Sequence, residues 1–201
     1  MIAIDTKQAL IDIALKAFIE RGYDSVPLKE IADATGIKQA SIYYHFKDKN
    51  ALLDACAQTF FGKWEQWMRE SLPLDADLEL MIRAIVGSLG MDSLLVLRLY
   101  DADTESGQYR FLLDILTYCP QNMAYMHAFN QSFETMLAQK MEDAKQAGVI
   151  PRGVSPRGVY VLLSALMEGS NILCFTDPQI DFQKETDQLF QMIWEGICNA
   201  R

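Results

Sequence analysis

Apolar residues recur every three or four positions along most of this chain, which is the spacing of one buried face of an α-helix. The first stripe runs from Leu10 to Phe18, and Gly22 ends the predicted helix. A longer stripe belongs to a helix that begins after Asp48, whose side chain can cap it. Pro73 ends this predicted helix. The same spacing predicts further helices over residues 76–89, 92–101, 106–119, 121–147, 155–174 and 181–199. Because the sequence lacks the alternation of half-buried strands, the pattern predicts an all-α protein.

Residues 31–49 read IADATGIKQASIYYHFKDK and predict two short helices around a tight turn. Gly36 stands at the turn, where glycine adopts the left-handed backbone at little cost. Ile37, Ile42 and Phe46 form a narrow apolar stripe under the second helix. Other side chains remain on its outer side: Gln39, Ser41, Tyr43, Tyr44 and His45. Such a helix suits the major groove of duplex DNA, so this segment predicts a helix-turn-helix DNA reader.

The amino-terminal segment also resembles the DNA-binding domain of TetR-family transcriptional regulators. The residues that carry the resemblance fall at fixed spacing: Phe18, Gly22, Tyr23, Ile31, Ala32, Gly36, Tyr43, His45, Phe46, Lys49, Leu52 and Leu53. They span about a quarter of the chain, and the remainder resembles the family in length and helical texture. The resemblance implies a three-helix helix-turn-helix DNA-binding domain over residues 1–50. It also implies a helical-bundle domain for ligand binding and dimerisation over residues 51–201.

The family resemblance implies which residues touch DNA. Tyr43, His45 and Lys49 match positions that hold the DNA backbone, and their phenol, imidazole and ammonium groups can all donate to phosphate. Gln39 and Tyr44 project from the same helix and are candidates for base edges, since glutamine pairs bidentately with adenine. The predicted contact set is Lys38, Gln39, Ala40, Ser41, Tyr43, Tyr44, His45 and Lys49.

Several positions depart from the family pattern. Lys38 stands where the family often has a Ser or Thr helix cap, and a lysine cannot accept amide hydrogen bonds. Ala40 replaces a common glycine, and Val26–Pro27 replace a hydroxyl pair that contacts phosphate. These departures alter the expected backbone contacts. For a single aromatic residue such as Tyr43, packing against a neighbour is the alternative interpretation.

The carboxy-terminal region is rich in large, soft side chains, which suit an apolar ligand pocket. The family resemblance implies that this domain holds an effector, and the composition favours a small, mostly apolar or aromatic molecule. The predicted pocket residues are Trp64, Trp67, Met68, Tyr100, Tyr118, Met126, His127, Phe129 and Met167. The alternative is that most of these residues are ordinary core.

The last two long helices are apolar on more than one side, which predicts burial on more than one side. A two-fold homodimer built from four helices, two from each subunit, explains this pattern and is typical of the family. The predicted dimer residues are Val159, Leu162, Leu163, Leu166, Leu189, Ile193 and Trp194. An internal core alone is the competing interpretation.

Charge is distributed unevenly along the 201 residues. The net charge of -9 lies entirely in residues 51–201, because residues 1–50 contain seven basic and seven acidic side chains. We therefore expect a neutral DNA-binding region, with Lys38, Lys47 and Lys49 close together, and an acidic remainder that repels phosphate. DNA binding should weaken strongly with salt.

Composition narrows the remaining possibilities. The longest apolar run, residues 160–167, is too short for a membrane span, and the sequence predicts no signal peptide. The four scattered cysteines are expected to be reduced, and two histidines argue against a metal site, so we expect no cofactor and a cytoplasmic location.

These patterns favour a ligand-responsive transcriptional regulator over an enzyme. The most favoured form is a repressor that a small effector releases from a palindromic operator in double-stranded DNA. A small helical enzyme finds little support, because the sequence shows neither a nucleophile motif nor a phosphate loop. A protein-interaction module that no longer binds DNA is a third alternative.

Overall fold

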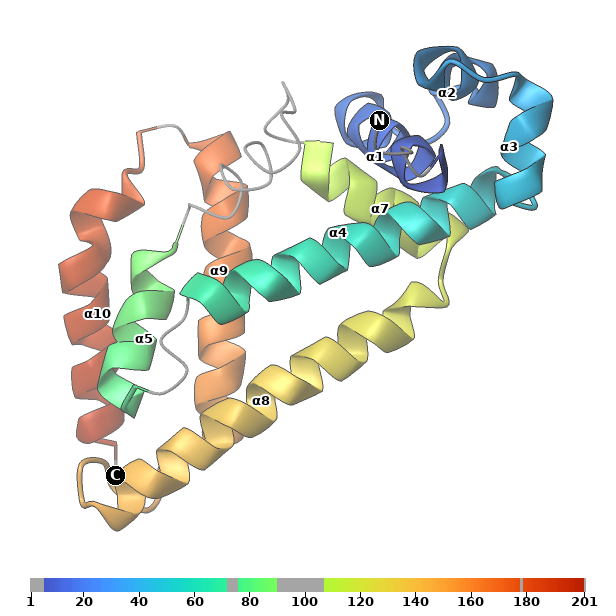
Figure 1. The fold of residues 1–201 in the computed structure, drawn as a ribbon. Coiled ribbons are helices and arrows are strands. Elements are labelled where there is room, and N and C mark those ends of the chain that lie inside the picture. The colour runs from blue at the N-terminus through green and yellow to red at the C-terminus, as the bar shows by residue number, and fades with distance from the viewer. Residues whose placement is uncertain (1–5, 72–75, 90–106, 178, 201) are drawn as a thin grey trace. The chain divides into compact units, whose positions relative to one another are not determined.

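The computed structural model describes residues 6–71, 76–89, 107–177 and 179–200, and every regular element in these ranges is a helix (Figure 1). The helices of this part are α1 (Thr6–Arg21), α2 (Leu28–Thr35), α3 (Gln39–His45), α4 (Lys49–Ser71), α5 (Leu78–Gly87), α7 (Gly107–Tyr118), α8 (Asn122–Gln146), α9 (Pro156–Thr176) and α10 (Phe182–Cys198). The all-α prediction is confirmed. The predicted helix over residues 92–101, the predicted loop over residues 101–106 and Tyr100 lie outside the described residues.

Local capping rules explain where several helices begin. The Asp48 carboxylate accepts the amide of Ala51 at 2.8 Å, so the predicted cap is confirmed, and Ser155 Oγ accepts the amide of Gly158 at 3.1 Å at the start of α9. Asp77 caps α5 in the same way, through the amide of Leu80. α2 begins at Leu28, directly after Pro27, which occupies the cap position with an extended backbone. Gly36 ends α2 with φ +76°, the left-handed backbone that the sequence predicted.

The chain divides into two compact units, the first made of Met1–Glu65 and Leu95–Met126 and the second of Gln66–Leu94 and His127–Arg201. The predicted division into functional domains at residue 50 is a separate matter and stays a prediction. In the first unit α1 packs against both α2 and α7, and α2 packs against α3. Its buried core combines Leu15 and Phe18 of α1 with Ile42 of α3 and Leu52 of α4. Phe111, Ile115 and Cys119, at the α7 end of the unit, complete this core.

In the second unit α5 packs against α10, and Phe190 of α10 is fully buried. The Arg83 guanidinium of α5 lies 3.9 Å from the centre of the Phe190 ring and pairs with Asp187 at 3.1 Å. On α8 and α9, Phe133 and Tyr160 lie with their ring centres 6.1 Å apart. Within the described ranges, no helix has the length and apolar character that crossing a bilayer requires.

Candidate nucleic-acid interface

α3 is a seven-residue helix that exposes nearly all of its side chains. Ile42 alone in this helix is buried, against the core of the first unit. Tyr43 is 54% exposed and Tyr44 is 89% exposed, while Gln39 and Ser41 are also exposed. This arrangement matches the predicted stripe of Ile42 and Phe46, both of which are buried. The outer side of α3 is therefore available to a partner, which is the geometry that a DNA-reading helix needs.

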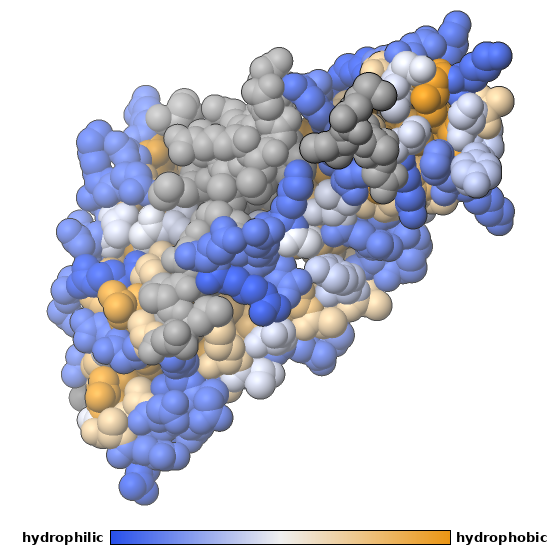
Figure 2. Space-filling model, in the orientation of Figure 1, coloured by the Kyte–Doolittle hydropathy of each residue, from blue (hydrophilic) through white to orange (hydrophobic). Residues whose placement is uncertain are grey.

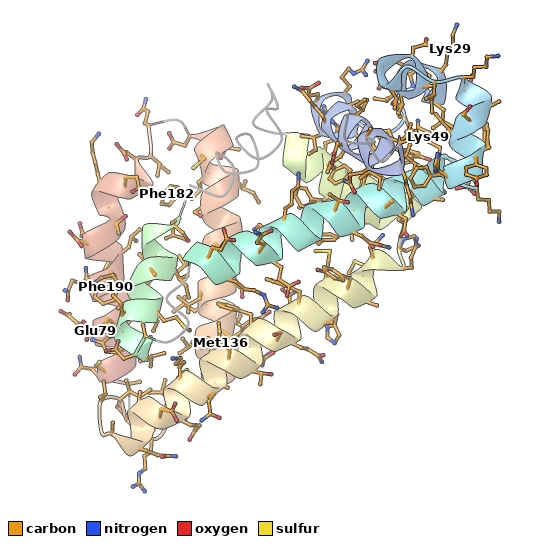
Figure 3. The ribbon with its side chains drawn as sticks, in the orientation of Figure 1. Lys29, Lys49, Glu79, Met136, Phe182 and Phe190 are labelled. Carbon is orange, nitrogen blue, oxygen red and sulfur yellow. The ribbon has the colours of Figure 1, made fainter. Side chains whose placement is uncertain are left out.

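The start of α3 carries positive charge instead of a side-chain cap. Lys38 occupies the cap position with an extended backbone, and its side chain accepts no hydrogen bond there, as the sequence predicted. Two more exposed lysines lie in the same region of the chain: Lys29 on α2 and Lys47 just after α3. Figure 3 shows Lys29 projecting away from the helices of this unit. The uncapped amides and these ammonium groups together favour an anionic backbone such as that of DNA.

Lys29 was absent from the predicted contact set. Its neighbour Glu30 forms an ion pair with Arg21, and this pairing lowers the pKa of the Glu30 carboxyl while it raises that of the Arg21 guanidinium. The carboxylate next to Lys29 is thus partly neutralised. The available signal was an exposed lysine in the first turn of α2, which many helices carry for solubility alone.

Lys49 lies in surroundings that differ from the predicted phosphate contact. Its ammonium donates a hydrogen bond to the backbone carbonyl of Tyr23 and lies 4.2 Å from the centre of the Tyr23 ring. Burial lowers the pKa of this ammonium. In Figure 3 the side chain lies among the helices of the first unit. In this structure Lys49 therefore contributes to the internal packing of the first unit, and its contact with DNA stays a prediction.

Tyr23 is the centre of this internal network. Its hydroxyl donates to the Asn50 side chain, and its ring lies over the ring of Tyr118, with centres 4.5 Å apart. Burial raises the pKa of Tyr23 to about 12, and the neighbouring Cys119 and Asp48 add to the effect. The phenol of Tyr23 is therefore neutral at physiological pH, and its contacts lie within the first unit.

The predicted pocket residues are divided between the two units. Trp64, Tyr118 and Met126 belong to the first unit, and His127, Phe129 and Met167 belong to the second. Trp67 lies on α4 and Met68 follows it, but their side chains are outside the description, as is the whole of Tyr100. Tyr118 donates its hydroxyl to Asp24 at 2.6 Å, so here it serves the network around Tyr23. His127 is exposed, and the pocket stays a prediction.

α9 presents an apolar face to solvent, although its residues differ in part from the predicted ones. Val159 and Leu163 are buried within their own unit, whereas Leu162 is exposed and Leu166 half-buried. The exposed apolar residues share one side of the helix: Val161, Leu162, Ala165, Ile172 and Leu173. We call these five residues the α9 face. Gly169 lies on the same side and permits close approach of a second helix.

α10 adds a smaller apolar surface. Met192 is 65% exposed, while the predicted dimer residues Leu189, Ile193 and Trp194 are half-buried. Trp194 stacks with Phe190 at a ring separation of 6.2 Å, so it also serves the core of the second unit. In Figure 2, orange surface residues appear in the part of the view occupied by α5 and α10. The sequence did not single out Met192. Apolar residues lie on more than one side of α10, and their spacing does not show which side is exposed.

The amino-terminal region matches a known family of proteins. Residues 10–56 match the family described as bacterial regulatory proteins, tetR family. The chain is 24% identical over 202 aligned residues to the HTH-type transcriptional regulator AcrR of Shigella flexneri, covering 96% of this chain and 89% of that protein. It is 36% identical over 77 residues to the HTH-type transcriptional repressor KstR2 of Rhodococcus jostii (strain RHA1), covering 36% and 38% of the two chains.

Solved structures share the fold over the whole chain. A putative TetR-family transcriptional regulator from Rhodococcus sp. superposes with a TM-score of 0.70 at 17% identity, over 97% of this chain and 100% of that one. The superantigen PfiT superposes with a TM-score of 0.72, also at 17% identity, over 100% of both chains. These two likenesses establish the fold, an amino-terminal helix-turn-helix followed by a helical domain.

Proposed function

We propose that this chain is a repressor, released from a palindromic operator by a small, mostly apolar or aromatic effector. Its amino-terminal residues make it a member of the TetR family of bacterial regulatory proteins. The family is one of DNA-binding transcriptional regulators. Within it, we assign DNA reading to residues 1–50 and effector binding and dimerisation to residues 51–201. DNA is the target, so we place the protein in the cytoplasm.

The observation that carries this proposal is the exposure of α3. Tyr43 and Tyr44 are large side chains that solvent surrounds, and only Ile42 of the helix is buried. A helix kept for packing alone would bury more of its residues, whereas a DNA-reading helix must hold its outer face open. We assign base contacts to Gln39 and Tyr44 and backbone contacts to Ser41, Tyr43 and His45. Lys38, Lys29 and Lys47 supply positive charge that attracts the DNA phosphates. Ala40 permits close approach of the helix to the DNA.

The α9 face supports a homodimer. Five apolar residues exposed along one helix favour burial against a second copy, since monomers seldom expose contiguous apolar patches of this kind. A two-fold dimer presents two α3 helices to successive major grooves, about 34–36 Å apart. This symmetry is the reason for proposing a palindromic operator.

The effector proposal rests on the composition of the second half and on the family. Met167 and Phe129 are half-buried, and methionine and aromatic side chains adapt to apolar guests. If effector and DNA favour different arrangements of the dimer, each weakens the other by the same factor. Typical coupling energies are about 1–3 kcal/mol, or roughly 5–150-fold in affinity.

Selection of genomic DNA tests the regulator directly. The purified chain is incubated with fragments of the host genome, and the bound fragments are sequenced. We expect enriched fragments that share an inverted repeat with half-sites one helical turn apart. A Gln39→Ala, Tyr44→Ala double variant should lose this enrichment while remaining dimeric. Gln131→Ala, an exposed glutamine on α8, is the matched control and should select the same fragments.

Recovery of unrelated fragments, or of none, contradicts the proposal. Once a fragment is known, a panel of aromatic and aliphatic compounds is screened for release of that fragment. Compounds that release it should also raise the melting temperature of the free protein, because they bind the folded state. Retained repression of a reporter in the presence of every stabilising compound argues against an effector-released repressor.

A further inference from the structure

Three polar side chains of α7 lie one helical turn apart and face the end of α1: Arg110, Asp114 and Tyr118. All of them belong to the first compact unit, yet they are separated from their partners by ninety or more positions in the sequence. On its neighbouring side, α7 gives Phe111 and Ile115 to the shared core. α7 is thus fixed to the DNA-binding region by both apolar and polar contacts.

Arg110 completes the carboxyl end of α1. The last carbonyls of a helix have no partner within the helix, and they carry partial negative charge. The Arg110 guanidinium donates to the carbonyls of Ile19, at 2.7 Å, and of Glu20. Gly22 follows with φ +81°, and a Cβ at that position would lie 3.1 Å from Cδ of Arg110. The glycine therefore allows both the left-handed turn and the close approach of the arginine.

Asp114 and Tyr118 hold the residues that follow α1. The Asp114 carboxylate accepts the backbone amide of Tyr23 at 2.7 Å. The Tyr118 hydroxyl donates to Asp24 at 2.6 Å, and its ring covers that of Tyr23. Residues 22–24 are the first part of the link between α1 and α2. Each of the three α7 side chains thus has a partner at the end of α1 or in this link.

We infer that Arg110, Asp114 and Tyr118 are positioning residues of the DNA-reading domain, and that they fix the end of α1 and the link to α2 from α7. α3 packs on α2, and α2 packs on α1, so the orientation of the reading helix follows that of the link. These residues act without touching DNA. The inference rests on the proposed function, because it assumes that α3 reads DNA.

Amide hydrogen exchange tests the inference without DNA. Arg110→Met removes both hydrogen bonds to α1, and we expect the amides of residues 22–28 to exchange about tenfold faster. Amides of α10 should exchange at the wild-type rate. Arg152→Met is the matched control: it removes the same charge from an exposed arginine in the turn before α9 and should leave residues 22–28 unchanged.

Affinity for a selected genomic duplex, measured by fluorescence anisotropy at several salt concentrations, gives the second readout. We expect Arg110→Met to bind about tenfold more weakly, because a smaller share of molecules holds the competent geometry. The slope of log affinity against log salt should stay at its wild-type value, since the bound complex keeps all of its phosphate contacts. A residue that itself touched phosphate would lower that slope by about one.

Conservative variants separate positioning from a general loss of folding. Arg110→Lys keeps a donor at the end of α1 and should recover most of the affinity that Arg110→Met loses. Asp114→Asn keeps an oxygen that can accept the Tyr23 amide and should bind DNA nearly as tightly as the wild type. Unchanged exchange and affinity in Arg110→Met would overturn the inference, as would a lowered salt slope. Faster exchange in α10 as well would indicate a general structural role and would overturn it too. If the wild-type chain selects no DNA, the proposed function fails, whereas the exchange result still decides whether α7 holds the link.

Discussion

Lys47 and Lys49 are two positions apart, but their ammonium groups lie in different surroundings. Lys47 is exposed beside α3, whereas Lys49 donates to the Tyr23 carbonyl and lies over the Tyr23 ring. The two lysines are identical in chemistry and close in sequence. Their expected roles nevertheless differ: Lys47 serves the phosphate backbone, and Lys49 serves the internal packing of the DNA-binding region.

Replacing each lysine by methionine separates these roles. Lys47→Met should lower the salt slope of DNA binding by about one and change the free energy of unfolding by less than about 0.5 kcal/mol. Lys49→Met should lower the free energy of unfolding by about 1–2 kcal/mol, because it removes the donor to the Tyr23 carbonyl. Urea denaturation and salt-dependent anisotropy are the two measurements. Equal stability of both variants would contradict the structural role of Lys49.

Tyr23 makes stability depend on alkaline pH. Its pKa is raised to about 12 in the folded protein, so the folded state prefers the neutral phenol. A raised folded pKa contributes stability that is complete below the unfolded pKa of about 10 and is lost as pH rises toward the folded value. Burial likewise raises the pKa of Cys119 to about 11. We expect the urea midpoint to fall between pH 10 and 12, and to fall less in Tyr23→Phe; an equal fall in both proteins would contradict this account.

At the scale of the elements, the first turn of α3 lacks a side-chain cap, as does that of α2. Lys38→Ser would supply a cap, worth about 0.5–2 kcal/mol of helix stability, but it also removes a positive charge beside the proposed DNA backbone. We therefore expect a higher melting temperature together with weaker, less salt-dependent DNA binding. Lys38→Thr is the matched variant and should behave alike. A rise in both stability and affinity would show that Lys38 does not contribute to DNA binding.

The turns after α1 and α2 offer a matched pair of glycines. Gly22 and Gly36 both have positive φ, but a Cβ at Gly22 would press on Arg110, whereas at Gly36 it would meet nothing within 4 Å. Gly36→Ala should cost about 1–2 kcal/mol from the left-handed backbone alone. Gly22→Ala should cost more, because the arginine must also move. If both variants lose the same free energy of unfolding in urea denaturation, the Arg110 side chain moves aside without a measurable cost.

The ends of elements were largely predictable from sequence, because they depend on neighbouring residues. Asp48 caps its helix as expected, and Gly36 takes the expected backbone. The place of α7 was not predictable, since its contact with the end of α1 joins residues about ninety positions apart. The direction of Lys49 was equally hidden, because a carbonyl and a phosphate are both suitable acceptors for an ammonium group.

The faces of α9 show a second limit of sequence reasoning. Val159 and Leu162 both fit an apolar stripe, but only the structure shows that Val159 faces its own unit and Leu162 faces solvent. Helical spacing identifies apolar positions without showing which of them the subunit itself buries. The family resemblance located the helix-turn-helix correctly, because its residues lie within one short local motif.

At the scale of the whole molecule, dimerisation is expected to control DNA binding. Ala165 lies on the α9 face, where a charged side chain would have to be buried against a second copy. Ala165→Glu should shift the protein to monomer in sedimentation and reduce operator affinity at least tenfold. Ala128→Glu, the same change at an exposed alanine of α8, is the control and should remain dimeric. A dimeric Ala165→Glu variant would show that the subunits meet elsewhere.

The reading helix depends on the rest of the protein through very few side chains. Ile42 is buried, but Gln39, Tyr43 and Tyr44 contribute almost nothing to the core. Exchanges at these three positions should therefore leave the folded scaffold nearly as stable as before. A gene duplicate could acquire a new target site through a handful of codon changes, and a combinatorial library at the same three positions should yield folded proteins with altered sequence preference.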